Sequence, residues 1–339
     1  MRIGFIIYGS IDILTGGYLY DRIVVQGLTQ LGHEVEVISL PSDSYLRRLW
    51  LGFSPGLCRR LLDGHFDILI QDELCHPSLF LVNKKLRRQA GPLLIALVHH
   101  VLCDEPRHRW QNMLLAIAER GFLASVDGFI HNSKTTQRNV ASLVHHNKPQ
   151  LIAYPAGDRF GSPLSAETLT ERTHRPGPLE LLFLGIVIPR KGLLPLLEAL
   201  AGVDRDLWRL SIAGGLDFDS AYTAEAQQLV LQLGLSDSVR FLGPLQDDKL
   251  VETLSSSHIF CMPYAYEGFG IAILEAMAFG LPAIGSQNGA ACETICHGEN
   301  GFLLAEGDLG GLEPLLVQLH RDREELQRLA LAARVTYVD

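Results

Sequence analysis

The sequence contains no apolar run of the roughly 18–20 residues that a membrane-spanning helix requires. Met1 is followed at once by a strand-like run from Ile3 and by no cleavage site, so we expect no signal peptide. The six cysteines show no C-x-x-C spacing, which predicts buried reduced thiols instead of disulfides or a metal site. They are Cys58, Cys75, Cys103, Cys261, Cys292 and Cys296. These absences predict a cytoplasmic protein.

The chain contains many charges of both signs, but its two halves differ in net charge. Residues 1–150 carry 16 Lys and Arg against 13 Asp and Glu, a net charge of +3, and residues 151–339 carry −12, which gives −9 overall. A basic first half is typical of a surface that meets an anionic acceptor or membrane. Because the total is acidic and no recognised binding motif occurs, we predict no nucleic-acid partner.

At 339 residues, with 47% apolar and 20% charged residues, the chain is long enough for two globular domains. Strand-like and helix-like stretches alternate along the first half, which indicates a parallel, doubly wound α/β sheet. The expected strands are 3–8, 34–40, 67–70, 93–98 and 128–131, and the expected helices are 17–31, 78–89, 111–125 and 133–145.

Proline and glycine crowd together between the two halves, which predicts an interdomain linker at 156–178. Alternation then restarts. The expected strands are 179–184, 209–213, 239–242, 259–262, 283–285 and 301–304, and the expected helices are 193–201, 221–233, 247–255, 269–279, 291–295, 311–320 and 322–335. The predicted fold is therefore two Rossmann-like domains, 1–155 and 179–339, facing each other across a cleft.

The stretch from Tyr266 to Pro282 carries the strongest functional signal. Its glycines let backbone approach a ligand, and an apolar helix follows whose N-terminus suits a phosphate. The one acid within that helix, Glu275, needs a hydrogen-bond donor if it is buried, and a ribose diol could supply one. Glu267 lies on the preceding turn, where it could face the same ligand. The alternative is that Glu275 pairs with a protein cation and Glu267 is solvated.

Several ordered motifs resemble the family-4 retaining glycosyltransferases of the GT-B fold. EGFGIAILEA resembles the family's E-x7-E motif, and GSQNGAACETICHGENGFLL resembles the segment that follows it. FLGIVIPRKGL is similar to the phosphate turn, and SVRFLGPLQDDKL to the next strand and acidic helix start. In the first half, LTGGYLYDRIVVQGLTQLGHEVEVISL is similar to the Gly-Gly loop, first helix and second strand. YPAGDRF looks like a variant of the family's linker signature.

The resemblance implies a role for each matching residue. The catalytic set would be Glu267 near the reacting carbon, the cleft histidine His99, and Lys191, which would neutralise the leaving phosphate. The remaining residues would bind the donor, with Glu275 holding the ribose. They are Gly16, Gly17, Arg190, Phe269, Gly270 and Ile271.

The implied reaction moves a hexose from a nucleoside diphosphate sugar to a hydroxyl acceptor, with retention by front-face attack. Negative charge develops on the diphosphate, and Lys191 with a helix N-terminus would stabilise it electrostatically. We therefore expect no cofactor and no metal ion. Two features depart from the family pattern: Ile186 stands where arginine is common, and the C-terminal helix expected to cross back onto the first domain is not evident before Asp339.

Other interpretations remain open at this level. Gly268-x-Gly270 could belong to an NAD-type oxidoreductase, but Ile273 replaces the third small residue and no acid follows the next strand. A non-catalytic sugar-nucleotide-binding protein is the second alternative, and Ile186 favours it. His99 competes with the adjacent His100 for the cleft position.

Structural explanations also exist for several candidate residues. Lys191 could be a solvated charge, and Gly16-Gly17 only a tight turn. Asp72-Glu73 and Asp104-Glu105 follow strands and could contact acceptor hydroxyls or simply cap helices. The basic, apolar stretch 45–62 fits either an interfacial helix on an anionic membrane, at its inner face, or an ordinary surface helix.

Overall fold

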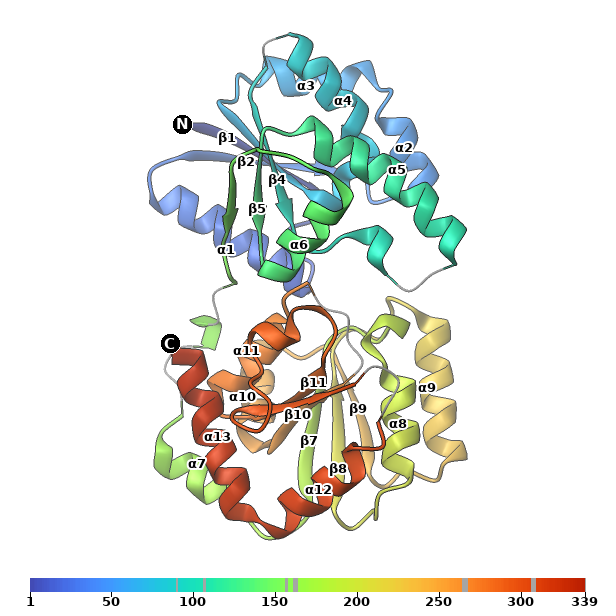
Figure 1. The fold of residues 1–339 in the computed structure, drawn as a ribbon, viewed down its shortest axis with the longest axis vertical. Helices are drawn as coiled ribbons and strands as arrows, with labels where there is room; N and C mark the ends of the chain where they lie inside the picture. Colours follow the sequence, from blue (N-terminus) through green and yellow to red (C-terminus); the bar gives the residue numbers. More distant parts are fainter. Residues whose placement is uncertain are drawn as a thin grey trace. The chain divides into compact units, whose positions relative to one another are not determined.

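The computed structural model describes residues 1–89, 91–105, 108–155, 158–160, 164–263, 268–305 and 309–338, with Asp158 and Val338 described by their backbone only. The chain divides into two compact units, Met1–Pro155 and Ala156–Asp339. Each unit is built on one six-stranded sheet in which all neighbouring strands run parallel (Figure 1).

The first sheet has the order β2-β1-β3-β4-β5-β6. Its strands are β1 (Arg2–Tyr8), β2 (Glu34–Leu40), β3 (Ile68–Asp72), β4 (Leu93–Val98), β5 (Gly128–His131) and β6 (Gln150–Ile152). The helices are α1 (Gly16–Gln30), α2 (Tyr45–Leu51), α3 (Pro55–Asp63), α4 (His76–Arg88), α5 (Arg109–Ser125) and α6 (Lys134–Leu143), with short 3-10 turns η1 (Glu73–Cys75) and η2 (Leu102–Asp104). The crossover from β1 to β2 carries α1, and the later crossovers, which run the other way along the sheet, carry α2 to α5. Right-handed connections therefore put α1 on one face of the sheet and α2 to α5 on the other (Figure 1).

The second sheet has the order β12-β11-β10-β7-β8-β9. Its strands are β7 (Leu179–Leu184), β8 (Trp208–Ala213), β9 (Val239–Gly243), β10 (Ile259–Met262), β11 (Ala283–Ser286) and β12 (Gly301–Leu304). The helices are α7 (Ala166–Thr173), α8 (Leu193–Ala201), α9 (Ser220–Gln232), α10 (Asp247–Ser256), α11 (Ile271–Ala278), α12 (Leu312–Arg321) and α13 (Arg323–Val338). The 3-10 turns are η3 (Asp158–Phe160), η4 (Pro189–Lys191) and η5 (Gly289–Glu293).

Local sequence explains why these elements form. The continuous apolar runs LLIALV and IFCM become the interior strands β4 and β10, as expected for parallel strands covered on both faces. Ser133 caps α6, since its Oγ accepts a hydrogen bond from the Thr136 N–H at 3.0 Å. The predicted doubly wound α/β fold is confirmed in both units, with most predicted elements within two residues of the observed bounds.

Three segments differ from the prediction. The stretch 45–62 forms two helices, α2 and α3, because Pro55 starts a new helix and Ser54 caps it, its Oγ accepting from the Leu57 N–H at 3.4 Å. The short edge strand β6 was not predicted. The helix expected at 291–295 is the 3-10 turn η5, which begins two residues earlier.

The interpretation of 156–178 as a linker was wrong for α7, which is a structural part of the second unit. Arg172 of α7 is 2% exposed. Its guanidinium donates to the carbonyl oxygens of Phe279 and Gly280, each at 2.7 Å. These carbonyls follow the last turn of α11, where a cation satisfies free acceptors and complements the helix dipole. The prediction failed because the prolines and glycines on either side of this eight-residue helix indicated a linker.

All six cysteines are free thiols, and four of them are buried. The prediction of burial was wrong for Cys292 and Cys296, which are exposed around η5. In the part of the chain that the structure describes, we find no helix with both the length and the apolar character to cross a membrane.

Candidate active site

The carboxyl edge of the first sheet gathers three chain segments. The strand order reverses between β1 and β3, and ligands bind at such a switch point in open parallel sheets. Helix α1 starts shortly after β1, with Thr15 as N-cap and Gly16 and Gly17 as its first residues. β3 ends at Asp72, and His99 directly follows β4. Of the predicted residues, Gly16, Gly17 and His99 thus lie at one edge.

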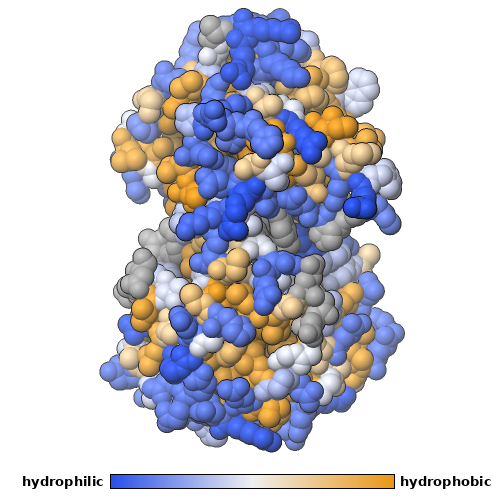
Figure 2. Space-filling model, viewed as in Figure 1, coloured by the Kyte–Doolittle hydropathy of each residue, from blue (hydrophilic) through white to orange (hydrophobic). Residues whose placement is uncertain are grey.

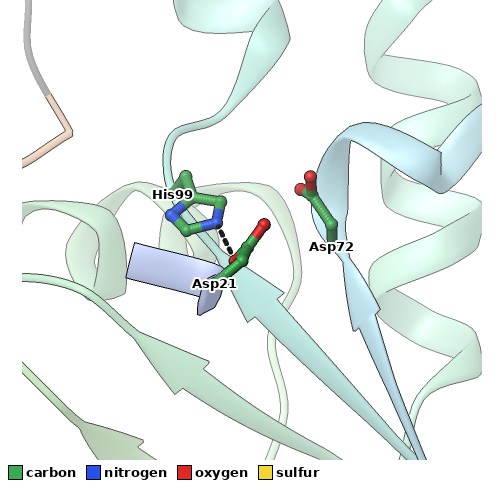
Figure 3. Close-up of side chains that lie close together, drawn as sticks. All are labelled: Asp21, Asp72 and His99. Carbon is green, nitrogen blue, oxygen red and sulfur yellow. Dashed lines mark hydrogen bonds and ion pairs between the residues drawn. The ribbon is translucent and has the colours of Figure 1, made fainter. Parts of the chain in front are cut away.

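Three buried side chains form a cluster at this edge: Asp21 from α1, Asp72 from the end of β3, and His99 (Figure 3). His99 Nε2 donates to Asp21 Oδ1 at 2.9 Å, and one polar atom from each residue lies within 4.8 Å of the others. Among the described residues, the buried Asp21 Oδ2 has no hydrogen-bond partner. The second ring nitrogen of His99 points away from both carboxylates (Figure 3).

The carboxylates set the protonation state of His99. Burial lowers the pKa of the ring, but the charge and hydrogen bond of Asp21, together with the charge of Asp72, raise the pKa to about 9. Burial raises the pKa of Asp72 to about 6, although the nearby His99 opposes this. At neutral pH the His99 ring is therefore an imidazolium, which can donate hydrogen bonds but cannot act as a base.

The surroundings of the ring separate His99 from its neighbour in the sequence. Tyr20 packs edge-on against His99 with ring centroids 5.3 Å apart. A Cβ at Gly17 would lie 3.9 Å from His99 Cδ2, so the glycine leaves space directly beside the ring. His100 instead lies with its Nε2 2.9 Å from Glu105 Oε1. Of the two histidines, only His99 belongs to the cluster.

A second buried cluster consists of Glu73, His76 and Glu119, with one polar atom from each within 4.8 Å of the others. Burial and the proximity of Glu119 raise the pKa of Glu73 well above its usual range. Burial also acts to raise the pKa of Glu119, but the neighbouring Glu73 and the charge of His76 outweigh it and lower that pKa. Of these two carboxyl groups, Glu73 is therefore the one that favours the protonated form.

Both clusters contain groups that could ligate a divalent cation. The sequence also has two Asp-x-Asp tripeptides, and both contribute to local structure. Asp206 N–H donates to Asp204 Oδ1 at 3.1 Å, and Asp219 caps α9 by accepting from Tyr222 N–H at 3.0 Å. Metal independence stays a prediction.

In the second sheet the strand order reverses between β7 and β10. The turn after β7 leads through η4 to α8, and the turn after β10 leads to α11. Because neighbouring parallel strands end at the same edge, the turn after β7 and the start of α11 flank the switch point of this sheet. The predicted residues Arg190 and Lys191 lie in η4, and Phe269, Gly270 and Ile271 lie at the start of α11.

The Lys191 side chain points back toward the end of β7, the strand that precedes its turn. Its Cε and Nζ lie 3.7 and 3.8 Å from the position that a Cβ on Gly185 would take. Burial, and secondarily the charge of Arg190, lower the pKa of Lys191 well below its usual value. A bound anion would offset both effects and restore the charge on Lys191.

Helix α11 begins at a left-handed residue, Gly270, with φ of 91°, a conformation that strains other residues. Phe269 and Gly270 are buried at its N-terminus, and Ile271 is half-buried. The short, mostly apolar helix therefore presents its first N–H groups at the sheet edge. Glu267 lies outside the described residues, so its predicted role stays a prediction.

Glu275 is 6% exposed, and its Oε1 accepts a hydrogen bond from Arg159 Nη1 at 3.1 Å. Arg159 also pairs with Asp247 through Nη2. Burial raises the pKa of Glu275, although Arg159 acts in the opposite direction. The structure thus agrees with the alternative, in which Glu275 pairs with a protein cation. Its contact with a ribose stays a prediction. The pair with Arg159 does not contradict it, because a carboxylate offers about four acceptor positions and Arg159 uses one of them.

Two partners of the candidate residues were not predicted from the sequence. Asp21 stands one turn after Gly17, where an acid on the apolar side of an amphipathic helix was the available signal. Arg159 lies within the quoted YPAGDRF segment, but nothing in the sequence relates it to Glu275, which is 116 residues away. Both partners become visible only in the folded structure.

A family model described as "Glycosyl transferases group 1" matches residues 166–336. Among curated proteins, the D-inositol 3-phosphate glycosyltransferase of Nocardia farcinica is 24% identical, covering 90% of this chain and 77% of that protein. The phosphatidyl-myo-inositol mannosyltransferase of Mycobacterium leprae is 28% identical, covering 95% of this chain and 88% of that protein.

Solved structures are similar over almost the whole chain. A sucrose-phosphate synthase from Thermosynechococcus elongatus gives a TM-score of 0.80 at 19% identity, covering 99% of this chain and 94% of that chain. Anabaena HepE in complex with UDP and glucose gives 0.76 at 20% identity, with the same coverage. At this level of identity the similarity shows the fold, which is that of GT-B proteins with two Rossmann-like halves.

Proposed function

Because the chain belongs to the glycosyl transferases of group 1, we propose that it is a retaining hexosyltransferase of the family-4 type. Its donor is a nucleoside diphosphate sugar, and its acceptor is a hydroxyl group of a glycan, a lipid-linked molecule or a small molecule. The observation that carries the proposal is the carboxyl edge of the second sheet. There the turn with Lys191 and the N-terminus of α11 flank the switch point, and both suit a diphosphate.

In the proposed step, the bond from the anomeric carbon to the diphosphate oxygen breaks. The acceptor oxygen bonds to the same face of that carbon, and its proton passes to the departing diphosphate oxygen. Negative charge develops on the diphosphate, where the Lys191 ammonium and the N–H groups at 269–271 stabilise it without a metal ion. Glu275 holds the ribose beside Arg159, and Glu267 orients the donor sugar.

His99 takes part as a hydrogen-bond donor. Its pKa of about 9 keeps the ring cationic at neutral pH. A cation with one nitrogen bound to Asp21 can offer the other nitrogen to a sugar hydroxyl or a phosphate oxygen. Gly17 leaves space beside the ring.

Two measurements test the proposal. Thermal unfolding with UDP, GDP and ADP in turn identifies the nucleotide, since a ligand at 100 times its Kd adds about 2.7 kcal/mol of stability. Transfer of a labelled sugar from the matching donor is then followed, and the anomeric configuration of the product is read by NMR. Stabilisation by no nucleotide, or inversion of configuration, would overturn the proposal.

Variants assign the roles. We expect Lys191→Met to lower kcat by about 100-fold, the usual cost of removing one electrostatic stabiliser of the transition state. Lys249→Met, a change at an exposed lysine of the same unit, is its control and should leave kcat unchanged. Glu275→Gln should weaken nucleotide binding, whereas Glu252→Gln, at an exposed acid of α10, should not.

The second candidate is a non-catalytic sugar-nucleotide-binding protein, which Ile186 in the phosphate turn favours. It predicts nucleotide stabilisation without sugar transfer by the wild-type protein. Transfer that is lost in Glu267→Ala with nucleotide binding retained would exclude this candidate.

The six free cysteines support a cytoplasmic location, where thiols stay reduced.

A further inference from the structure

The solvent side of helix α5 is apolar, which its packing in the first unit does not explain. Phe122 and Leu123 face inward and are fully buried. Four large apolar side chains face outward with 60, 65, 57 and 66% of their surface exposed: Trp110, Met113, Leu114 and Ile117. Their spacing of i, i+3, i+4 and i+7 places them in one stripe along the helix.

Positive charge flanks this stripe. Arg109 and Arg120 are exposed, one just before the stripe and one three residues after it, and both lie to one side of it, roughly 70–90° around the helix from its centre. The acid of α5, Glu119, points inward and is fully buried, where it accepts backbone N–H bonds from Leu102 and Cys103 at 2.6 and 3.1 Å. The exposed side of α5 is therefore apolar at its centre, cationic at its ends and free of carboxylates.

A neighbouring helix also exposes large apolar side chains next to an arginine, although Arg47 pairs there with Asp43 at 3.1 Å. Leu46, Trp50 and Phe53 of α2 and the loop after it are exposed, with Arg47 beside them. Both α2 and α5 pack on α4, and Tyr45 of α2 lies 3.2 Å, Oη to Nε2, from His76 of α4. Figure 2 shows apolar surface over the part of the first unit where Figure 1 places α5.

We infer that the α5 face, formed by Trp110, Met113, Leu114 and Ile117 with Arg109 and Arg120, docks on an anionic lipid bilayer. Apolar side chains enter the boundary between headgroups and acyl chains, and arginines at both ends reach lipid phosphates. The net charge of +3 in the first 150 residues adds electrostatic attraction to such a surface. The sequence alone suggested a membrane-binding helix at 45–62, whereas the structure assigns the main contact to α5.

A second copy of the chain fits this face less well. In a symmetric dimer the same patch meets itself, so Arg109 and Arg120 would face their own copies. Four side chains also cover much less than the roughly 1,000 Å² that a stable protein interface buries. A bilayer requires neither a complementary patch nor a minimum area, and binding grows with each side chain that enters it.

Co-sedimentation with vesicles tests the inference. We expect wild-type protein to bind vesicles of phosphatidylcholine with phosphatidylglycerol, and to bind pure phosphatidylcholine at least about tenfold more weakly. Ile117→Glu should weaken binding to the anionic vesicles by about tenfold or more, because it puts a charge into the apolar boundary. Leu231→Glu is the matched control, since Leu231 of α9 is 64% exposed in the second unit. It should bind like wild type.

Tryptophan fluorescence gives a second readout. In Trp50→Phe, Trp110 is the exposed indole, while Trp208 is fully buried and unaffected by lipid. A blue shift on addition of anionic vesicles places Trp110 in the bilayer. No binding of wild type, or equal binding of wild type and Ile117→Glu, overturns the inference. A dimer in light scattering that Ile117→Glu dissociates, without vesicle binding, assigns the face to a second copy instead. No sugar donor is present, so the result is independent of the proposed transferase activity.

Discussion

Replacement of Asp21 by asparagine removes the charge that keeps His99 protonated and retains a side chain of the same size. In the wild-type protein, His99 Nε2 donates to Asp21 Oδ1 at 2.9 Å, and the pKa of the ring is raised from 6.5 to about 9. Without the carboxylate, burial becomes the dominant influence, and burial lowers the pKa of a histidine. We expect the pKa of His99 in Asp21→Asn to fall to about 6.5 or below.

The size of the effect follows from the wild-type shift. A rise in the pKa of His99 from 6.5 to about 9 corresponds to about 3 kcal/mol of stabilisation. Because the folded pKa exceeds the unfolded value, this contribution is complete below about pH 6.5 and is lost as the pH rises through about 9. The advantage of wild type over Asp21→Asn in free energy of unfolding should therefore be about 3 kcal/mol larger near pH 6 than near pH 10.

NMR titration of the imidazole Cε1–H signals measures the pKa directly. The chain has 13 histidines, and a spectrum of His99→Gln identifies the signal of His99. Urea denaturation of both proteins across the same pH range measures the stability difference. Glu105→Gln is the control, because it removes the carboxylate partner of the adjacent His100 and should leave the titration of His99 unchanged. A wild-type midpoint near 6.5, or parallel stability profiles of wild type and Asp21→Asn, would refute the reasoning.

Three further substitutions have definite expected results. Gly17→Ala adds a methyl group 3.9 Å from His99 Cδ2. The free energy of unfolding should stay the same or rise by roughly 0.5 kcal/mol, while kcat/KM for sugar transfer should fall about tenfold or more. Arg172→Met removes two donors, each 2.7 Å from a carbonyl at the end of α11, and should lower the free energy of unfolding by about 3 kcal/mol in urea denaturation. Gly301→Ala places a Cβ 2.2 Å from the Ala283 backbone oxygen of β11 and should cost more than about 2 kcal/mol.

Matched variants keep these expectations specific. Gly27→Ala lies in the same helix as Gly17, and apart from the adjoining helix backbone no atom lies within 4 Å of the new Cβ, so it should stabilise the protein without changing transfer. Arg175→Met changes an exposed neighbour of Arg172 and should leave stability unchanged. Equal loss of transfer in Gly27→Ala, equal destabilisation in Arg175→Met, or a fully stable Gly301→Ala would each contradict the corresponding argument.

Local sequence was sufficient for the fold. Continuous apolar runs such as LLIALV and IFCM predicted buried parallel strands, and the alternation with amphipathic stretches predicted doubly wound sheets. Ser133 predicted the start of α6, because a capping side chain acts on a backbone N–H three residues away. The predictions failed at α7 and at the break between α2 and α3, where proline and glycine have different effects within a few residues.

The candidate site was only partly accessible in this way. Glycines, a helix N-terminus and a lysine after a strand have local signatures, so Gly17, Gly270 and Lys191 could be proposed from the sequence. The partners of the charged groups could not. Asp21 reaches His99 across 78 residues, and Arg159 reaches Glu275 across 116.

The same limit applies to the surface of α5. An amphipathic pattern shows that a helix has an apolar side, but only the packed structure shows that α5 turns Trp110 and Ile117 to solvent and buries Glu119. The sequence determined which strands and helices form, because those depend on contacts a few residues apart. Tertiary structure decided which charges meet and which apolar groups stay exposed, because parallel strands bring distant residues to one sheet edge and place their helices in layers with an inner and an outer side.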